Sequence, residues 1–144
     1  IKHLIMGHFD KALKLFNEAL KIDSNSSLAH LMKARTHFVL HMQKEALLSV
    51  ENAIKADPKW YLPRAEKSKY LLAQNDISKA EKEAKKAIEL NAEGPEGWIS
   101  LGEIQYTLGK LKQSEISFDK ALAINSELAE AHIGRGKVLI SKFY

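Results

Sequence analysis

Cysteine is absent from this chain of 144 residues, and arginine, proline and glycine are scarce. Without thiols the chain cannot form a disulfide framework or carry out cysteine chemistry, which fits a reducing compartment, and we expect a cytoplasmic location. No run approaches the roughly 18 to 20 apolar residues that cross a bilayer, so we expect no association with a membrane. An initiator Met is also missing, and we interpret the chain as a fragment of a longer protein.

Basic residues outnumber acidic ones, yet their pattern does not favour nucleic-acid binding. The formal net charge is +4, but 19 of the 22 basic residues are lysines and only three are arginines. The lysines are mostly interleaved with acids, as in EKEAKKAIE at residues 81–89, which is typical of a solvated helical surface. Nucleic-acid-binding proteins usually gather arginines and aromatic residues on one face. We expect no nucleic-acid partner.

A row of small residues recurs along the chain with a constant period. Four alanines are separated from one another by 34 residues, namely Ala19, Ala53, Ala87 and Ala121. Small residues also precede them by seven positions, at Ala12, Ala46, Ala80 and Ser114. Four positions after the alanines come Asp23, Asp57, Asn91 and Asn125. A fixed period of this length indicates an array of identical supersecondary units, and no segment shows the pattern of a strand.

Each period contains two amphipathic helices. In the copy that begins at Pro95 we predict one helix from about Glu96 to Leu108 and a second from about Leu111 to Ile124, because inward-facing residues recur at three- and four-residue steps. Turn residues between paired helices stand at Gly7, Asn75 and Gly109. Where paired helices cross, a second set of small residues allows the backbones to approach, namely Ala34, Ser68, Gly102 and Gly136.

These features resemble the tetratricopeptide repeat (TPR) superfamily, whose pattern is W-x2-L-G-x2-Y, then G-x-Y, then A-x3-F-x2-A, then P. The matching residues are Trp98, Leu101 and Gly102 in the first block, Gly109 and Leu111 in the second, Ala12, Phe16 and Ala19 in the third, and Pro58. The departures are Ser24, Ala92 and Ser126 in place of proline, Ser114 in place of alanine, His41 in place of a turn glycine, and Ala84 in place of the aromatic residue. The resemblance covers essentially the whole chain.

The resemblance implies an all-α fold, a right-handed superhelical α-solenoid of antiparallel helix pairs. The phase of the repeat gives a partial first repeat at 1–26 and complete repeats at 27–60, 61–94 and 95–128. The first helix of a fifth repeat covers 129–144. We expect its apolar residues to form a surface that awaits a partner helix, namely Val138, Leu139, Ile140, Phe143 and Tyr144.

The first helices of the repeats line the concave groove in members of this family, so the phase also predicts a binding surface. The candidate groove residues are Leu28, Leu31, Met32, Arg35, Phe38, Leu62, Glu66, Lys69, Ile99, Glu103, Tyr106 and Lys137. The same phase adds Ala65, Leu72, Glu96, Ser100, Glu130, Ile133, Gly134 and Ile140. This surface is apolar near its N-terminal end and acidic toward Glu130. An amphipathic helix or an extended peptide suits it.

Family members that grip the acidic C-terminal tail of a chaperone use a clamp of lysine, asparagine and arginine side chains. The equivalent positions here hold Leu31, Arg35, Glu66, Glu96 and Ser100, and one repeat further along they hold Ala65, Lys69, Ser100, Glu130 and Gly134. Acidic residues at these places would repel an acidic tail. We do not expect a chaperone tail as the partner.

The sequence contains no recognisable catalytic, cofactor or metal motif. His37 and His41 are four residues apart, a spacing that can hold zinc, and His30 lies on the same helix face. A zinc site needs a third or fourth ligand, but no acidic residue lies between them at a useful offset, and packed histidines are the better interpretation. We therefore expect a non-catalytic scaffold that binds a segment of a partner protein in the groove, without cofactor or metal. Two alternatives stay open: a substrate-docking arm of a larger glycosyltransferase or methyltransferase, and self-association through the open ends of the array.

Overall fold

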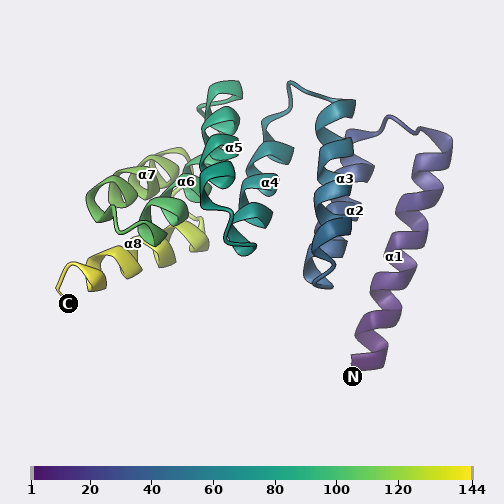
Figure 1. The fold of residues 1–144 in the computed structure, drawn as a ribbon, viewed down its shortest axis with the longest axis horizontal. Helices are drawn as coiled ribbons and strands as arrows, with labels where there is room; N and C mark the ends of the chain where they lie inside the picture. Colours follow the sequence, from purple (N-terminus) through teal and green to yellow (C-terminus); the bar gives the residue numbers. More distant parts are fainter. Residues whose placement is uncertain (1, 144) are drawn as a thin grey trace.

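The computed structural model describes residues 2–143, which form eight α-helices and no strand. The helices are α1 (Lys2–Ile22), α2 (Ser27–Val39), α3 (Gln43–Ala56), α4 (Tyr61–Ala73), α5 (Ile77–Leu90), α6 (Pro95–Thr107), α7 (Leu111–Ile124) and α8 (Ala129–Ser141). They stack in chain order into an elongated, curved array with the termini at opposite ends (Figure 1). Positions 1 and 144 of the predicted outer repeats lie outside the described residues.

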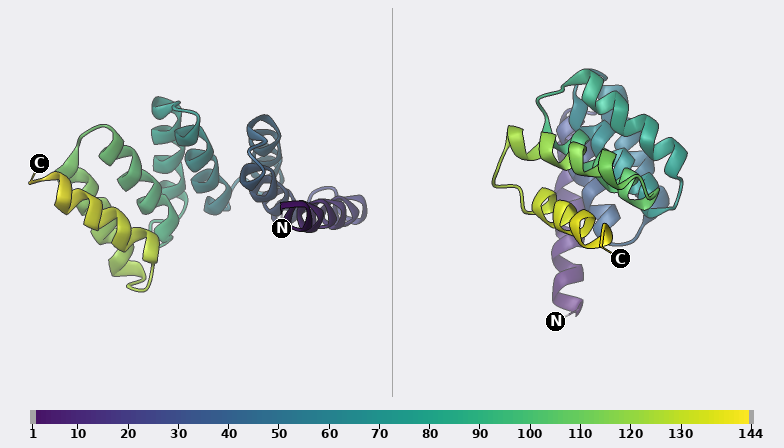
Figure 2. Two further views of the ribbon diagram at one scale, coloured as in Figure 1. Left: turned by 90° about the horizontal axis from the view of Figure 1, so that it is seen from below. Right: turned by 90° about the vertical axis from the view of Figure 1, so that its left-hand side faces the viewer.

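The helix boundaries repeat with the period of the sequence. Helices α2, α4, α6 and α8 begin 34 residues apart, and so do α3, α5 and α7. We call the first set A helices and the second set B helices, and α1 corresponds in phase to a B helix. Successive A and B helices pack as antiparallel pairs (Figures 1 and 2). The boundaries expected around Glu96 and Leu111 agree with the observed helices to within one residue.

Each turn from an A helix to its B helix contains one residue in the left-handed backbone region. These residues are His41, Asn75 and Gly109, with φ of 60°, 62° and 76°. In the last of these turns the amides of Gly109 and Lys110 donate to the carbonyls of Tyr106 and Gln105, which ends the helix in a Schellman motif. His41 therefore adopts the conformation for which glycine is favoured, at a cost that its neighbours must offset.

The recurring Asp or Asn after each B helix closes the loop to the next A helix. The side-chain Oδ1 accepts a hydrogen bond from the backbone amide two residues later, at Asp23, Asp57, Asn91 and Asn125. Such Asx turns explain why only these two residue types fill the position, because a short side-chain oxygen must reach its own backbone.

Small residues do lie at the crossings of the complete helix pairs. Ala34, Ser68, Ala46, Ala80 and Ser114 are fully buried. Ser114 Oγ donates to the carbonyl of Gly102 over 2.7 Å, and Ser68 Oγ donates to the carbonyl of Ala80 over 2.8 Å. Each bond joins a serine side chain on one helix of a pair to the backbone of the other helix.

Three hydrophobic clusters run along the array, each built from an A helix, its B helix and the next A helix. The first includes Leu31, Val50 and Tyr70, the second Leu71, Ala84 and Ile104, and the third Ile99, Phe118 and Val138. Every unit therefore depends on its neighbour for part of its core, as in other repeat arrays.

Three expectations about the fold are wrong. Val138 is not part of an open apolar surface, because it is fully buried in the third cluster. Gly7 does not form a turn, because α1 continues through it from Lys2 to Ile22. Residues 2–6 are too few to fold back as a separate helix, so they extend α1 instead. Gly136 does not lie at a helix crossing, since a Cβ placed there would meet no atom within 4 Å. No B helix covers α8 within the described residues.

Candidate functional site

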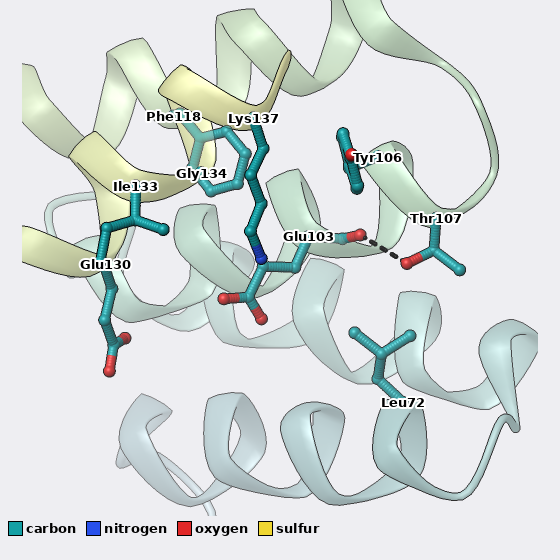
Figure 3. A pocket seen from close by; sticks show the side chains of 9 residues that line it. All are labelled: Leu72, Glu103, Tyr106, Thr107, Phe118, Glu130, Ile133, Gly134 and Lys137. Atoms are coloured by element: carbon teal, nitrogen blue, oxygen red, sulfur yellow. Dashed lines mark hydrogen bonds between the residues drawn. The ribbon is translucent and has the colours of Figure 1, made fainter. Parts of the chain in front are cut away.

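The A helices enclose two adjoining hollows on one face of the array. One has a volume of about 430 Å³, and we call it the α6–α8 hollow (Figure 3). It is lined by Leu72, Glu103, Tyr106, Thr107, Phe118, Glu130, Ile133, Gly134 and Lys137. The other, the α4–α6 hollow, has a volume of about 340 Å³ and is lined by Ala65, Glu66, Lys69, Glu96, Ile99, Ser100, Glu103 and Glu130. Because Glu103 and Glu130 border both, the hollows form one continuous surface across α4, α6 and α8.

The helical period places these residues on one surface. Glu96, Ile99, Ser100, Glu103 and Tyr106 of α6 follow one another at steps of three or one residues, so their side chains leave the helix on one side. The short loops hold successive A helices side by side, and residues about one repeat apart therefore meet. Ser100 Oγ lies 3.4 Å from the carbonyl of Ala65 in this way.

The α4–α6 hollow has an excess of negative charge. Four of its residues are glutamates and one is a lysine. Burial raises the pKa of Glu103, and the neighbouring carboxylate of Glu130 raises it further, while Lys69 and Lys137 lower it only in part. A cation placed near Glu103 would therefore reduce the negative potential at this carboxylate.

The other two glutamates of this hollow are held by neighbouring groups. Arg35 Nη2 of α2 lies 3.1 Å from Glu66 Oε1, and the Tyr61 hydroxyl donates to Glu96 Oε2 over 2.7 Å. Burial raises the pKa of Tyr61, and the bond to Glu96 adds to this, so the phenol stays a donor.

An aromatic stack extends this surface toward α2. The rings of Phe38 and Tyr70 are stacked with centroids 4.5 Å apart, and Lys69 Nζ lies 5.5 Å from the Phe38 centroid. Tyr70 is buried, and burial followed by the proximity of Glu66 raises its pKa. Lys69, which borders the α4–α6 hollow, therefore connects this surface to a packed aromatic pair.

The structure brings together the predicted groove residues of α4, α6 and α8. Glu66, Lys69, Ile99, Glu103, Tyr106 and Lys137 all border the two hollows. Ile99 is nearly buried and forms part of a hollow's floor, whereas Glu103 and Tyr106 are partly exposed.

The predicted residues of α2 have more varied places. Leu31 is wrong as a groove residue, because it is fully buried in the first cluster. Leu62 packs partly against the same cluster. Leu28 is exposed, and Met32 is half-buried with its sulfur 3.9 Å from Arg35 Nη1. Neither Leu28 nor Met32 borders the two hollows.

Phe118 and Thr107 line the α6–α8 hollow but were not among the groove residues predicted from the sequence. Phe118 belongs to a B helix and is buried, yet its ring reaches the α6–α8 hollow (Figure 3). A Cβ at Gly102 or Gly134 would come within 2.9 Å or 2.3 Å of this ring, so two glycines uncover it. The two glycines opposite an aromatic residue were the sequence signal from which the place of this ring could have been predicted. Thr107 ends α6, and its hydroxyl donates to the Glu103 carbonyl over 3.0 Å.

The histidines have separate structural contacts. His30 Nε2 lies 3.0 Å from the Ser24 carbonyl, Ser49 Oγ lies 3.4 Å from His37 Nδ1, and His41 forms the left-handed turn. Among the residues that the structure describes, no group of three potential ligands could hold a metal. No helix in the same part of the chain is long and apolar enough to cross a bilayer.

Comparison with known proteins identifies the repeat. Models of the tetratricopeptide repeat family match residues 3–26 and 66–130. A TPR repeat-containing protein of Methanocaldococcus jannaschii, MJ1428, is 32% identical over 123 residues, which cover 85% of this chain and 22% of that protein. The chain thus spans about a fifth of the length of this relative.

Solved structures share the fold at low sequence identity. The crystal structure of MamA has a TM-score of 0.75 at 19% identity and covers 98% of this chain and 82% of that one. The first TPR of Spaghetti (RPAP3), bound to the HSP90 peptide SRMEEVD, has a TM-score of 0.74 at 19% identity, covering 85% and 97%. The Arabidopsis OM64 TPR domain has a TM-score of 0.73 at 16% identity, covering 81% and 96%. Sequence pattern, architecture and comparisons agree that the chain belongs to the tetratricopeptide repeat superfamily.

Proposed function

We propose that this array is a non-catalytic protein-interaction scaffold that binds a segment of a partner protein along α4, α6 and α8. The observation that carries the proposal is the continuous surface formed by the two hollows. It combines apolar walls with charged groups at its centre, which is the composition expected where a peptide must be both held and oriented. The RPAP3 domain, which shares the fold, is described as bound to a peptide, which supports a role of this kind.

The charges of the surface favour a basic side chain in the bound segment. Glu103 and Glu130 border both hollows, and the raised pKa of Glu103 reflects negative charge that its neighbours offset only in part. A lysine or arginine placed between them would relieve that charge, while apolar residues on either side would contact Ile133 and Leu72. An acidic segment such as SRMEEVD would meet repulsion at the same place.

The experiment is selection of binding peptides from a random phage-displayed library, followed by measurement of their affinity by fluorescence anisotropy. We expect the selected peptides to share a basic residue flanked by apolar ones. Glu103→Lys should weaken their binding at least tenfold, which corresponds to about 1.4 kcal/mol.

The matched control is Glu89→Lys, which makes the same charge change at an exposed position of α5. It should leave the affinity unchanged except for a small long-range effect that disappears at higher salt. The proposal fails if no peptide is selected, or if both variants change the affinity equally.

A further inference from the structure

A third hollow lies between the B helices α3 and α5, where α4 packs against both of them (Figure 1). We call it the α3–α5 hollow. It has a volume of about 290 Å³ and is lined by Leu47, Glu51, Lys67, Leu71, Lys79, Lys82, Glu83 and Lys86. Two residues turn an α-helix by about 200°, so Lys67 and Leu71 leave α4 on the opposite side from Lys69 of the α4–α6 hollow. The α3–α5 hollow is therefore part of a different face of the array, inside complete helix pairs.

The α3–α5 hollow has an excess of positive charge. Four of its lining residues are lysines and two are glutamates. Lys79, Lys82 and Lys86 follow one another on α5 at steps of three and four residues, and all three are exposed. Lys79 Nζ lies 3.6 Å from Asp76 Oδ2, but a solvent-accessible pair of this kind contributes little. Like charges at such spacing repel one another, and a negatively charged group placed among them would reduce that repulsion.

The two glutamates of this hollow are already paired with cations of α4. Glu83 is buried, and its carboxylate oxygens lie 3.0 Å from Arg64 Nη1 and 3.4 Å from Lys67 Nζ. Lys67 also forms an ion pair with Glu51. Lys86 Nζ of α5 is more distant from Glu83, at 3.9 Å. The lysines of α5 are thus the part of the charge that remains for a ligand.

The next repeat forms an equivalent hollow with fewer charged residues. It lies between α5 and α7, and seven of its lining residues stand 34 positions after residues of the α3–α5 hollow, namely Glu81, Lys85, Leu101, Gln105, Gln113, Ile116 and Ser117. Three of these, Leu101, Gln113 and Ile116, take the places of lysines. The same helix packing thus forms with uncharged residues, and buried ion pairs often stabilise a fold no more than well-packed apolar residues do. Packing alone therefore does not explain the lysines.

Two leucines give the α3–α5 hollow an apolar part. Leu71 is buried, and half-buried Leu47 packs against both the first and the second hydrophobic cluster. We propose that this hollow binds an acidic segment of a partner protein, in which an apolar side chain contacts Leu47 and the carboxylates beside it meet the lysines of α5. A nucleic acid would match the charge but offers no apolar side chain to the leucines. The surface along α4, α6 and α8 has the opposite charge preference, and the two surfaces are independent.

Fluorescence anisotropy with two labelled probes tests the proposal. The first probe is a pool of short peptides in which a central leucine or phenylalanine is flanked by aspartates and glutamates. The second is polyglutamate, which has the charge without the apolar side chain. The peptide pool should bind the chain at low salt, and polyglutamate should bind about tenfold more weakly or worse. Raising the salt concentration should weaken the binding of both probes, because the lysines are exposed.

Lys79→Gln combined with Lys82→Gln should weaken binding of the peptide pool by about tenfold or more. Both lysines are exposed, and glutamine already stands at the place of Lys79 in the next repeat, so thermal stability should not fall. Lys11→Gln combined with Lys14→Gln is the matched control, since these exposed lysines of α1 hold the same two repeat positions and lose the same charge. The control should bind the pool like the unchanged chain, apart from a small effect that salt removes.

Glu103→Lys separates this surface from the one along α4, α6 and α8. It should not weaken binding of the acidic pool, and the double variant of α5 should not weaken binding of the basic peptides expected at the other surface. The proposal fails if the acidic pool does not bind at low salt, if polyglutamate binds as tightly, or if the α1 control loses the same affinity. A single-stranded DNA probe that binds more tightly than the pool and loses affinity in the α5 variant would also overturn it, in favour of a nucleic acid.

Discussion

Adding one methyl group to α8 should have opposite effects at two positions that are only two residues apart. At Gly134 a Cβ would lie 2.3 Å from Phe118 Cζ and 2.4 Å from Cε1, and the ring is buried, with little room to move. At Gly136 a Cβ would meet nothing within 4 Å. Both glycines are in the interior of the same helix, so alanine gains the same backbone propensity at each.

The gain in helix propensity and the cost of overpacking differ in size, so their net effect can be predicted at each position. Alanine in place of glycine stabilises a helix interior by about 0.5 to 1 kcal/mol. Overpacking of a core by one methyl group costs about 1 to 3 kcal/mol. Gly136→Ala should therefore raise the free energy of unfolding by up to about 1 kcal/mol. Gly134→Ala should lower it by up to about 2.5 kcal/mol, the largest difference between the packing cost and the propensity gain.

Urea unfolding followed by far-UV circular dichroism measures both values. Phe118→Val supplies the control, because the same repeat position holds Val50 in α3. In that background Gly134→Ala should no longer destabilise the array, giving a coupling of about 1 to 3 kcal/mol. Equal stabilisation by the two alanines, or a cost of Gly134→Ala that persists in the Phe118→Val background, would refute the packing argument.

Three further changes test the same structure. Glu103→Gln should be more stable than the unchanged chain at neutral pH, because burial and Glu130 raise the pKa of Glu103. The difference in stability between the two chains should grow as the pH rises above 4.5 and vanish below it. Thermal melts across pH can follow this difference. Burial and Lys33 lower the pKa of His37. The contribution of neutral His37 to folding stability is therefore present above pH 6.5 and is lost as the pH falls below that value. His37→Gln should remove this part of the pH dependence of stability. Ala87→Leu should overpack a fully buried position and cost about 1 to 3 kcal/mol in urea unfolding; an unchanged midpoint would contradict the phase of the repeat.

The periodic features could be predicted because each depends on residues close together in the chain. The small residue at each crossing, the Asp or Asn of each Asx turn and the starts of the helices recur with the sequence, and local hydrogen bonds explain them. His41 is a residue whose conformation could not be predicted from its own identity. Histidine is enriched among left-handed residues but seldom adopts this conformation, and the equivalent Asn75 and Gly109 are what place it in the turn.

The candidate site was harder to predict, since it depends on contacts between repeats. The phase assigned Leu31 and Ile99 to one class of groove residue, but Leu31 is covered on all sides and Ile99 lies at the floor of a hollow. The neighbours that decide this come from other repeats. The pKa of Glu103 likewise depends on how deeply the neighbouring helices bury it and on the nearby charge of Glu130, which a sequence pattern does not specify.

The three hydrophobic clusters connect the helix pairs of the array through contacts between neighbouring units. Each cluster joins one helix pair to the next A helix, so we expect any bending of the array to be distributed among these junctions. A segment that lies across α4, α6 and α8 spans the junctions of the second and third clusters at once. Its binding would therefore fix the local curvature, and the bound half of the array would unfold as one block while α1 to α3 kept their own melting behaviour.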